Sequence, residues 1–390
     1  MKEKLLNSQS QYYFLLTIFT TAFFVLDLFY SVLVFKETSD IKLLIWNSII
    51  IHIVAFIVYV IGNYIILKTS SSFLIRLSFL TMTLSGVFGY FMLNKIPNFF
   101  LIFPILRGIS SGLYWVPTNI IALDGIHKAT RSRLFFFLSG SNSLIAIIVP
   151  IILGFYLDKS DNYKIVFVLF SLVSLLGIFF PWTFNGVKNL SFKISNFIKI
   201  FKKKGFLKFI TLKSGSSLMW VMGGLSGYLL PYIILGNEAS MGIYLTITAL
   251  IGSLIAFTTI NLQLKKKRSA GLIGIFIENI LNIVLAFNLL PIWLYITSIF
   301  GNIISPIVTP SEDELSLAIT DKFEIKDHIS IELCLLREFI YFSSGVLINL
   351  VLLFILGIGI DYKILLIGSL ISSSVIRLFL YSFTWLFVKN

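Results

Sequence analysis

The sequence predicts an all-α membrane protein in which twelve transmembrane helices form two halves of six helices each. First, 57% of the 390 residues are hydrophobic and only 13% are charged, whereas a soluble domain has roughly a quarter of its residues charged. Second, the apolar residues form continuous stretches long enough to cross about 30 Å of hydrocarbon at about 1.5 Å per residue. Third, lysine and arginine gather in every second connection between these stretches.

The expected spans follow one another with short polar connections. They are 12–35, 43–67, 74–94, 98–123, 134–157 and 164–186 in the first half, then 213–236, 240–261, 269–290, 291–311, 330–356 and 362–387 in the second. The first stretch is too long for a signal-peptide core and no small-residue cleavage site follows, so we expect it to stay as a helix. The division at Pro291 is the shortest. Three domains follow from these spans: an N-terminal bundle (1–186), a basic linker (187–212) and a C-terminal bundle (213–390).

The basic residues also predict how the helices are oriented. With the N-terminus inside, the inner connections hold 22 of the 31 lysines and arginines, the outer ones hold six, and three lie within spans. Positive charge marks the cytoplasmic side, so both termini are expected in the cytoplasm. The abundance of Ile, Phe, Lys and Asn suggests an AT-rich bacterial genome, so the expected location is a bacterial cytoplasmic membrane. The excess of basic residues on the inner side accounts for the net charge of +13 without nucleic-acid binding.

The linker carries Lys202, Lys203 and Lys204, and its apolar residues recur with a roughly helical spacing. Two interpretations fit this pattern equally well. The segment is either an amphipathic helix that lies on the anionic lipids of the inner leaflet, or a solvated connection between the two halves.

Glycine and proline positions within the spans suggest a family. The relevant residues are Arg107-Gly108-x3-Gly112 in the fourth span, Gly140, Pro150 and Gly154 in the fifth, and the pairs Gly108/Gly301 and Pro117/Pro310, which one offset along the chain relates. At these residues the chain resembles the major facilitator superfamily, and its fifth span resembles the drug/proton antiporter branch. The resemblance implies a secondary transporter whose first and fourth helices line a central cavity. The loop from Gly62 to Arg76 departs from the family pattern because it contains no acidic residue.

Ionisable residues within the spans are candidates for proton coupling, because each costs about 3 kcal/mol to insert on translocon scales. Asp27 and Arg107 are expected at similar depths, since their helices run in opposite directions, and they either form a pair that protonation breaks or a permanent structural ion pair. Glu278 lies near the middle of the ninth span, which the resemblance puts outside the cavity. Glu338 either lines the cytoplasmic mouth of the cavity or marks a late helix start.

Aromatic and polar residues on two helices are candidates for substrate contacts. Tyr114, Trp115 and Asn119 follow Arg107 on the fourth span, and Tyr114 shares the face of Arg107. Trp220 and Tyr228 lie on the seventh span, where packing and an interfacial aromatic belt explain them nearly as well. The 39 phenylalanines favour an apolar cavity and an amphiphilic or lipophilic substrate.

These observations predict a proton-coupled exporter of a small molecule, lipid or peptide that acts as a monomer. A glycolipid flippase of the same fold and a non-transporting scaffold or receptor are the alternatives. An enzyme is not expected, because no Ser/His, paired-Asp or metal constellation is visible at cavity depth. No nucleotide, metal or other cofactor is expected either, since no P-loop is present, Cys334 is the single cysteine and the three histidines are scattered.

Overall fold

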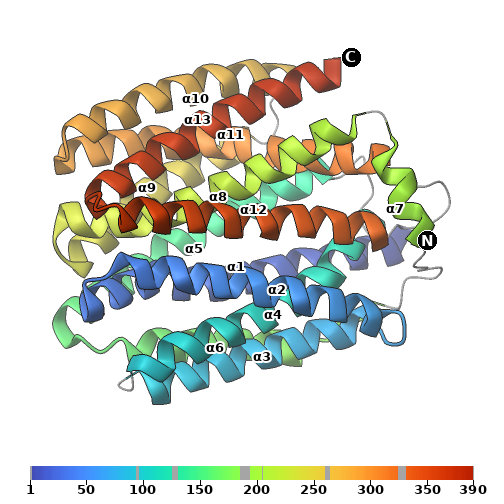
Figure 1. Cartoon of the computed structure of the whole chain (residues 1–390), viewed down its shortest axis with the longest axis horizontal. Helices are drawn as coiled ribbons and strands as arrows, with labels where there is room; N and C mark the ends of the chain where they lie inside the picture. The colour runs from blue at the N-terminus through green and yellow to red at the C-terminus, as the bar shows by residue number, and fades with distance from the viewer. Residues whose placement is uncertain are drawn as a thin grey trace.

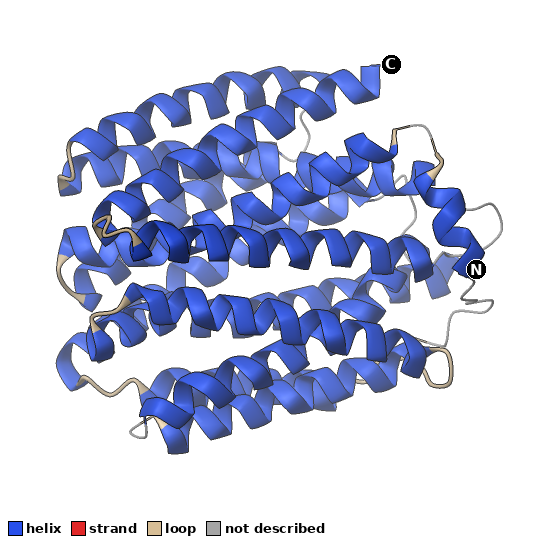
Figure 2. Ribbon diagram, viewed as in Figure 1, coloured by secondary structure: helices blue, strands red, loops and turns tan. Residues whose placement is uncertain are grey.

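The computed structural model describes residues 2–93, 96–124, 131–184, 194–203, 205–259, 264–323 and 331–389. Over these ranges the secondary structure is helical, without strands (Figures 1 and 2). Nine of the described helices are long and apolar enough to cross a membrane, and two shorter apolar helices, Lys164–Phe179 and Gly271–Phe287, accompany them. The predicted class, an all-helical multi-pass membrane protein, is therefore confirmed.

The helices fall into two groups joined by one short helix. The first group is α1 (Lys2–Thr38), α2 (Ile41–Ile66), α3 (Ser71–Met92), α4 (Ile96–Asp124), α5 (Arg131–Ser160) and α6 (Lys164–Phe179). The second group is α8 (Phe206–Leu235), α9 (Glu238–Thr259), α10 (Leu264–Phe287), α11 (Pro291–Phe323), α12 (Ile331–Gly357) and α13 (Tyr362–Lys389), and α7 (Ile194–Phe201) lies between the groups. We call these groups the N-half and the C-half.

Local chemistry accounts for several helix ends. The Asp40 carboxylate accepts a hydrogen bond from the Lys42 amide at the start of α2, and Ser70 accepts one from the Phe73 amide at the start of α3. Pro291 opens α11, where its fixed φ suits a first helical residue. The predicted division between α10 and α11 is therefore present, although the connection between them is short.

The linker differs from the prediction. Helix α8 begins at Phe206, earlier than residue 213, so the end of the expected linker belongs to a long helix. Gly205 precedes it with φ +93°, a left-handed conformation that residues other than glycine rarely adopt. In Figure 1, α7 runs across the ends of the long helices, at the end of the bundle where both chain termini lie. We call this the inner end and the opposite one the outer end.

The two halves meet along two seams, α5 with α9 and α2 with α12. Glycines bring α5 and α9 together: a Cβ on Gly242 would lie 2.4 Å from the Pro150 carbonyl oxygen, and one on Gly154 would lie 2.6 Å from the Glu238 carbonyl oxygen. On the second seam a Cβ on Gly345 would meet the His52 ring at 2.5 Å. Glycines therefore allow backbone contact at the first seam and make room for the His52 ring at the second.

The suggested internal repeat has unequal surroundings. A Cβ on Gly108 would meet Val54 of α2, whereas one on Gly301 would meet the Glu278 carboxylate of α10. Gly108 thus contacts the second helix of the N-half. The second helix of the C-half is α9, but Gly301 contacts α10, the third, so the two glycines do not contact corresponding helices. Pro310 lies in α11, but its side chain is outside the described part of the chain.

Candidate functional site

An ion pair between α1 and α4 is the central feature of the N-half. Arg107 Nη2 lies 2.6 Å from Asp27 Oδ1, so the predicted pairing of these residues is present. The Arg107 side chain is 9% exposed and the Asp27 side chain is 38% exposed. The carboxylate is thus the more accessible partner, and a proton can reach it without uncovering the guanidinium.

Aromatic rings surround the guanidinium. Its central carbon lies 4.9 Å from the Phe23 ring centroid and 5.9 Å from that of Tyr30, distances at which a cation is attracted to a ring face. The Tyr30 hydroxyl accepts a hydrogen bond of 2.7 Å from Asn47 Nδ2. Arg107 is therefore held by one carboxylate and by rings of the same helix, α1, that carries the carboxylate.

Tyr114 continues this face of α4. Its ring stacks on Phe19 of α1 with centroids 3.4 Å apart, and it is fully buried. Because Phe19 and Phe23 are one turn apart on α1, Arg107 and Tyr114 both point toward α1, as the spacing predicted. Trp115 is half-buried and touches the Phe19 ring edge to face.

The candidate residues on α8 separate from each other. Tyr228 is half-buried on α8, a helix of the C-half that contacts α1. Trp220 is 63% exposed, and no described contact joins it to Asp27 or Arg107. Of the aromatics selected from the sequence, Tyr114 and Trp115 therefore pack against α1, whereas Trp220 has no described contact with the ion pair.

A second polar cluster joins the halves toward the inner end. Asn119 Nδ2 of α4 donates to Glu338 Oε1 of α12 at 3.0 Å and to the Tyr59 hydroxyl of α2 at 3.1 Å. Arg337 Nη2 donates to the same Glu338 oxygen at 2.9 Å. All four residues are buried. We call Tyr59, Asn119, Arg337 and Glu338 the inner cluster; it is a contact between halves, and Asn119 is engaged in it.

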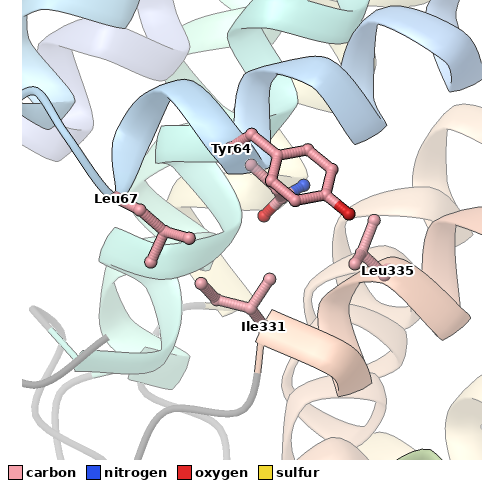
Figure 3. A pocket seen from close by; sticks show the side chains of 5 residues that line it. Tyr64, Leu67, Ile331 and Leu335 are labelled. Carbon is pink, nitrogen blue, oxygen red and sulfur yellow. The ribbon is translucent and has the colours of Figure 1, made fainter. Parts of the chain in front are cut away.

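A small crevice lies beside this cluster between the end of α2 and the start of α12 (Figure 3). Its cavity volume is about 10 Å³, and it is lined by Asn63, Tyr64, Leu67, Ile331 and Leu335. Asn63 Oδ1 is buried there without a hydrogen-bond partner. The volume is too small for a drug-sized compound, because ligand pockets usually measure roughly 300–1,000 Å³.

A third cluster closes the outer end. Lys36 Nζ of α1 lies 2.8 Å from Asp161 Oδ1 in the N-half and 3.0 Å from Glu238 Oε1 in the C-half. The Tyr163 hydroxyl donates to Glu238 at 2.5 Å. Glu238 begins α9, where the helix dipole favours a negative charge. Among the described ion pairs, Lys36–Glu238 is the one that joins the two halves. We call these four residues the outer cluster.

Burial and the neighbouring Glu238 carboxylate raise the pKa of the Tyr163 hydroxyl far above its ordinary value. Tyr163 therefore remains a hydrogen-bond donor at every physiological pH. Sequence patterns did not select this cluster, because charges at the ends of spans are common and Lys36 and Glu238 are far apart in the chain. The cluster becomes visible only in the tertiary structure, where the end of α1 meets the start of α9.

The outer cluster makes a direct prediction. Glu238→Gln removes the ion pair between the halves but leaves Lys36 paired with Asp161, so we expect the outer ends to separate about fivefold more often, as the loss of about 1 kcal/mol implies. Distances between spin labels on Lys159Cys and Ile358Cys, both exposed at the outer end, measure this. Asp161→Asn is the matched control, since it removes a charge from the same lysine within one half. Equal effects of the two substitutions would contradict the prediction.

Glu278 belongs to a separate place in the C-half. Its Oε2 lies 3.8 Å from Arg377 Nη1 of α13, and Arg377 Nη2 donates to Thr309 Oγ1 of α11 at 3.0 Å. Both charged side chains are largely buried. None of the described contacts connects Glu278 to the Asp27–Arg107 pair. The two candidate acids, Asp27 and Glu278, thus lie in different halves.

The whole chain is similar in structure to known transporters. The human organic anion transporter MFSD10 (TETRAN) aligns with a TM-score of 0.66 and 10% identity over 97% of this chain and 99% of its own. The E. coli fucose:proton symporter FucP (N162A) aligns with a TM-score of 0.64 and 13% identity over 99% and 98%. Both are major facilitator superfamily transporters. The sequence itself matches no protein-family model and no curated protein.

Proposed function

We propose that this chain, which has the fold of major facilitator transporters, is a secondary active transporter that exports an amphiphilic or lipophilic compound in exchange for protons. In this proposal twelve helices span a bacterial cytoplasmic membrane, both termini are cytoplasmic, and a monomer suffices. The observation that carries it is the Asp27–Arg107 ion pair between α1 and α4, in which the guanidinium is buried and the carboxylate is the more accessible partner. A fold alone does not establish a function, so the proposal depends on this site.

The positions of the polar clusters support alternating access. The outer cluster and the inner cluster each tie the N-half to the C-half, and the Asp27–Arg107 pair belongs to α1 and α4. Opening one end requires breaking only the contacts of that end. The site can then face one side of the membrane at a time, which is the condition for coupling two fluxes.

Each charged residue has a role in this proposal. A proton binds the Asp27 carboxylate from one side, which neutralises it and releases Arg107 from the pair; the proton leaves to the other side after the halves have moved. Substrate contacts are assigned to the half-buried Trp115 of α4 and Tyr228 of α8, whereas Tyr114, fully buried against Phe19, supports the α1–α4 contact. Glu338, which accepts a hydrogen bond from Asn119, is the coupling candidate at the inner contact. Glu278, paired with Arg377 within the C-half, is a coupling candidate apart from the substrate site.

Transport assays in vesicles test the proposal. Inverted membrane vesicles that contain the protein are loaded with a proton gradient and offered a cationic, an anionic and a zwitterionic fluorescent amphiphile, and a fluorescent lipid tests for flipping. We expect gradient-dependent uptake of at least one amphiphile. The spin-label pair at the outer end and a second pair at the inner end, Lys68Cys with Thr211Cys, should change in opposite directions as the pH changes.

Two results would count against the proposal. Uptake of every probe at the rate of empty vesicles, together with spin-label distances that do not respond to pH, would indicate a scaffold or receptor. Movement of the fluorescent lipid alone would indicate a flippase.

A further inference from the structure

Helix α7 has two opposite faces. At about 100° per residue, Asn196 and Ile200 share one face, and Ile198 and Phe201 share the other. Ile200 is fully buried, whereas Ile198 and Phe201 are 55% and 51% exposed. The helix is therefore docked on the bundle by one face only and presents apolar side chains on the other.

The docked face contacts α12. Ile200 packs in a small core with Leu333 and Leu336, and Asn196 Nδ2 donates to Glu332 Oε1 at 3.2 Å. Glu332, Leu333 and Leu336 occupy the turns of α12 directly before Arg337 and Glu338, which belong to the inner cluster. Helix α7 therefore contacts the first two turns of α12, and the inner cluster follows directly on the same helix.

The outward face combines apolar and basic side chains. Lys202 flanks Ile198 and Phe201, Lys199 lies at the border with the docked face, and both lysines are exposed; Leu207 at the start of α8 is 78% exposed. We call these five residues the α7 outward surface. The Phe201 ring packs edge to face on Phe206, with centroids 4.7 Å apart, which anchors the surface to α8.

The orientation of α7 decides what can cover this surface. It crosses the ends of the long helices at the inner end (Figure 1), so it runs parallel to a bilayer that those helices cross. An amphipathic helix in that plane buries its apolar side chains at the boundary between headgroups and acyl chains. Lysines beside those side chains favour a leaflet that contains anionic lipids.

We propose that the α7 outward surface binds anionic phospholipid headgroups, and that this binding stabilises the closed inner contact by fixing α12. The lipid site does not depend on the proposed transport activity, whereas its effect on the inner contact rests on alternating access. Anionic lipid then acts as a regulator: a leaflet rich in such lipids favours the conformation in which the inner cluster is formed.

Binding is measured with full-length protein in neutral detergent, using dihexanoylphosphatidylglycerol as the probe and dihexanoylphosphatidylcholine and inorganic phosphate as comparisons. We expect dihexanoylphosphatidylglycerol to bind most tightly of the three. Lys199→Gln with Lys202→Gln should weaken it about 25-fold, since each lysine near an anionic surface contributes about a fivefold factor. The matched control, Lys159→Gln with Lys363→Gln, removes two exposed lysines at the outer end and should leave the affinity unchanged.

The effect on conformation is measured in nanodiscs of phosphatidylcholine with and without 30% phosphatidylglycerol, by mass of lipid. We expect the Lys68Cys–Thr211Cys distance distribution of the parent to shift toward the short distance in the anionic discs, and that of the double lysine variant not to shift. A raised salt concentration should weaken the probe's affinity for the parent, which tests the charge contribution without any mutation.

Equal affinities for the two lipids, equal binding of free phosphate, or an equal loss in the control variant would overturn the lipid site. Preserved lipid binding without any change at the inner spin-label pair would overturn the regulation. Because binding is measured without a transported compound, a failure of the transport proposal leaves the affinity difference intact, so the two failures are distinguishable.

Discussion

Asp27→Asn is expected to abolish proton-driven accumulation while leaving downhill movement of the same probe measurable. The amide resembles the protonated carboxyl in shape and lacks a titratable proton, so the cycle loses its coupling step and keeps its binding site. Uptake with and without a proton gradient in inverted vesicles measures both quantities. Asp158→Asn, which changes an exposed carboxylate at the outer end, is the control and should transport normally.

Arg107 separates a coupling role from a structural one. Arg107→Ala leaves the Asp27 carboxylate without its partner, so we expect lower expression and a lower Tm. Because that carboxylate is 38% exposed, the loss should be smaller than the about 3–5 kcal/mol of a fully buried pair. Asp27→Asn combined with Arg107→Gln removes both charges and should restore folding but not coupling. Normal proton-driven transport by that double variant would mean that the pair is structural. Full proton-driven transport by Asp27→Asn alone would exclude Asp27 as the proton carrier.

Gly242→Ala is expected to force the α5–α9 seam apart. The new Cβ would lie 2.4 Å from the Pro150 carbonyl oxygen and 3.3 Å from the Gly154 Cα, both backbone atoms that cannot rotate away. Such overpacking costs about 1–3 kcal/mol, so the outer-closed conformation should become the minor one. The Lys159Cys–Ile358Cys spin-label distance should lengthen, and the Tm should fall.

Gly368→Ala provides the control for that experiment. Gly368 lies in α13, and an added Cβ there meets nothing within 4 Å. Alanine also favours a helix over glycine by about 1 kcal/mol, so we expect this variant to be unchanged or slightly more stable. A distance distribution for Gly242→Ala that matches the parent's would show that the seam does not close during the working cycle.

The sequence by itself determined the class of this protein and much of its helix pattern. Apolar stretches longer than a bilayer is thick leave the backbone few ways to satisfy its hydrogen bonds other than a helix, so membrane helices follow from composition and length alone. The Asp27–Arg107 pair was also predictable, because two opposite charges at equal depth in a low dielectric attract each other strongly. The shared face of Arg107 and Tyr114 followed from helical periodicity.

Contacts between distant helices were decided only by the tertiary structure. The sequence could not choose whether Glu338 lined a cavity mouth or marked a helix start; the hydrogen bond from Asn119 places it between the halves. It could not find the Lys36–Glu238 pair, because charges are ordinary at helix ends. The two residues meet because the end of α1 comes next to the start of α9. Periodicity reports which face of a helix is apolar, but which helix covers that face depends on packing across the whole chain. For that reason no local pattern specifies the backbone contact that Gly242 and Gly154 make between α5 and α9.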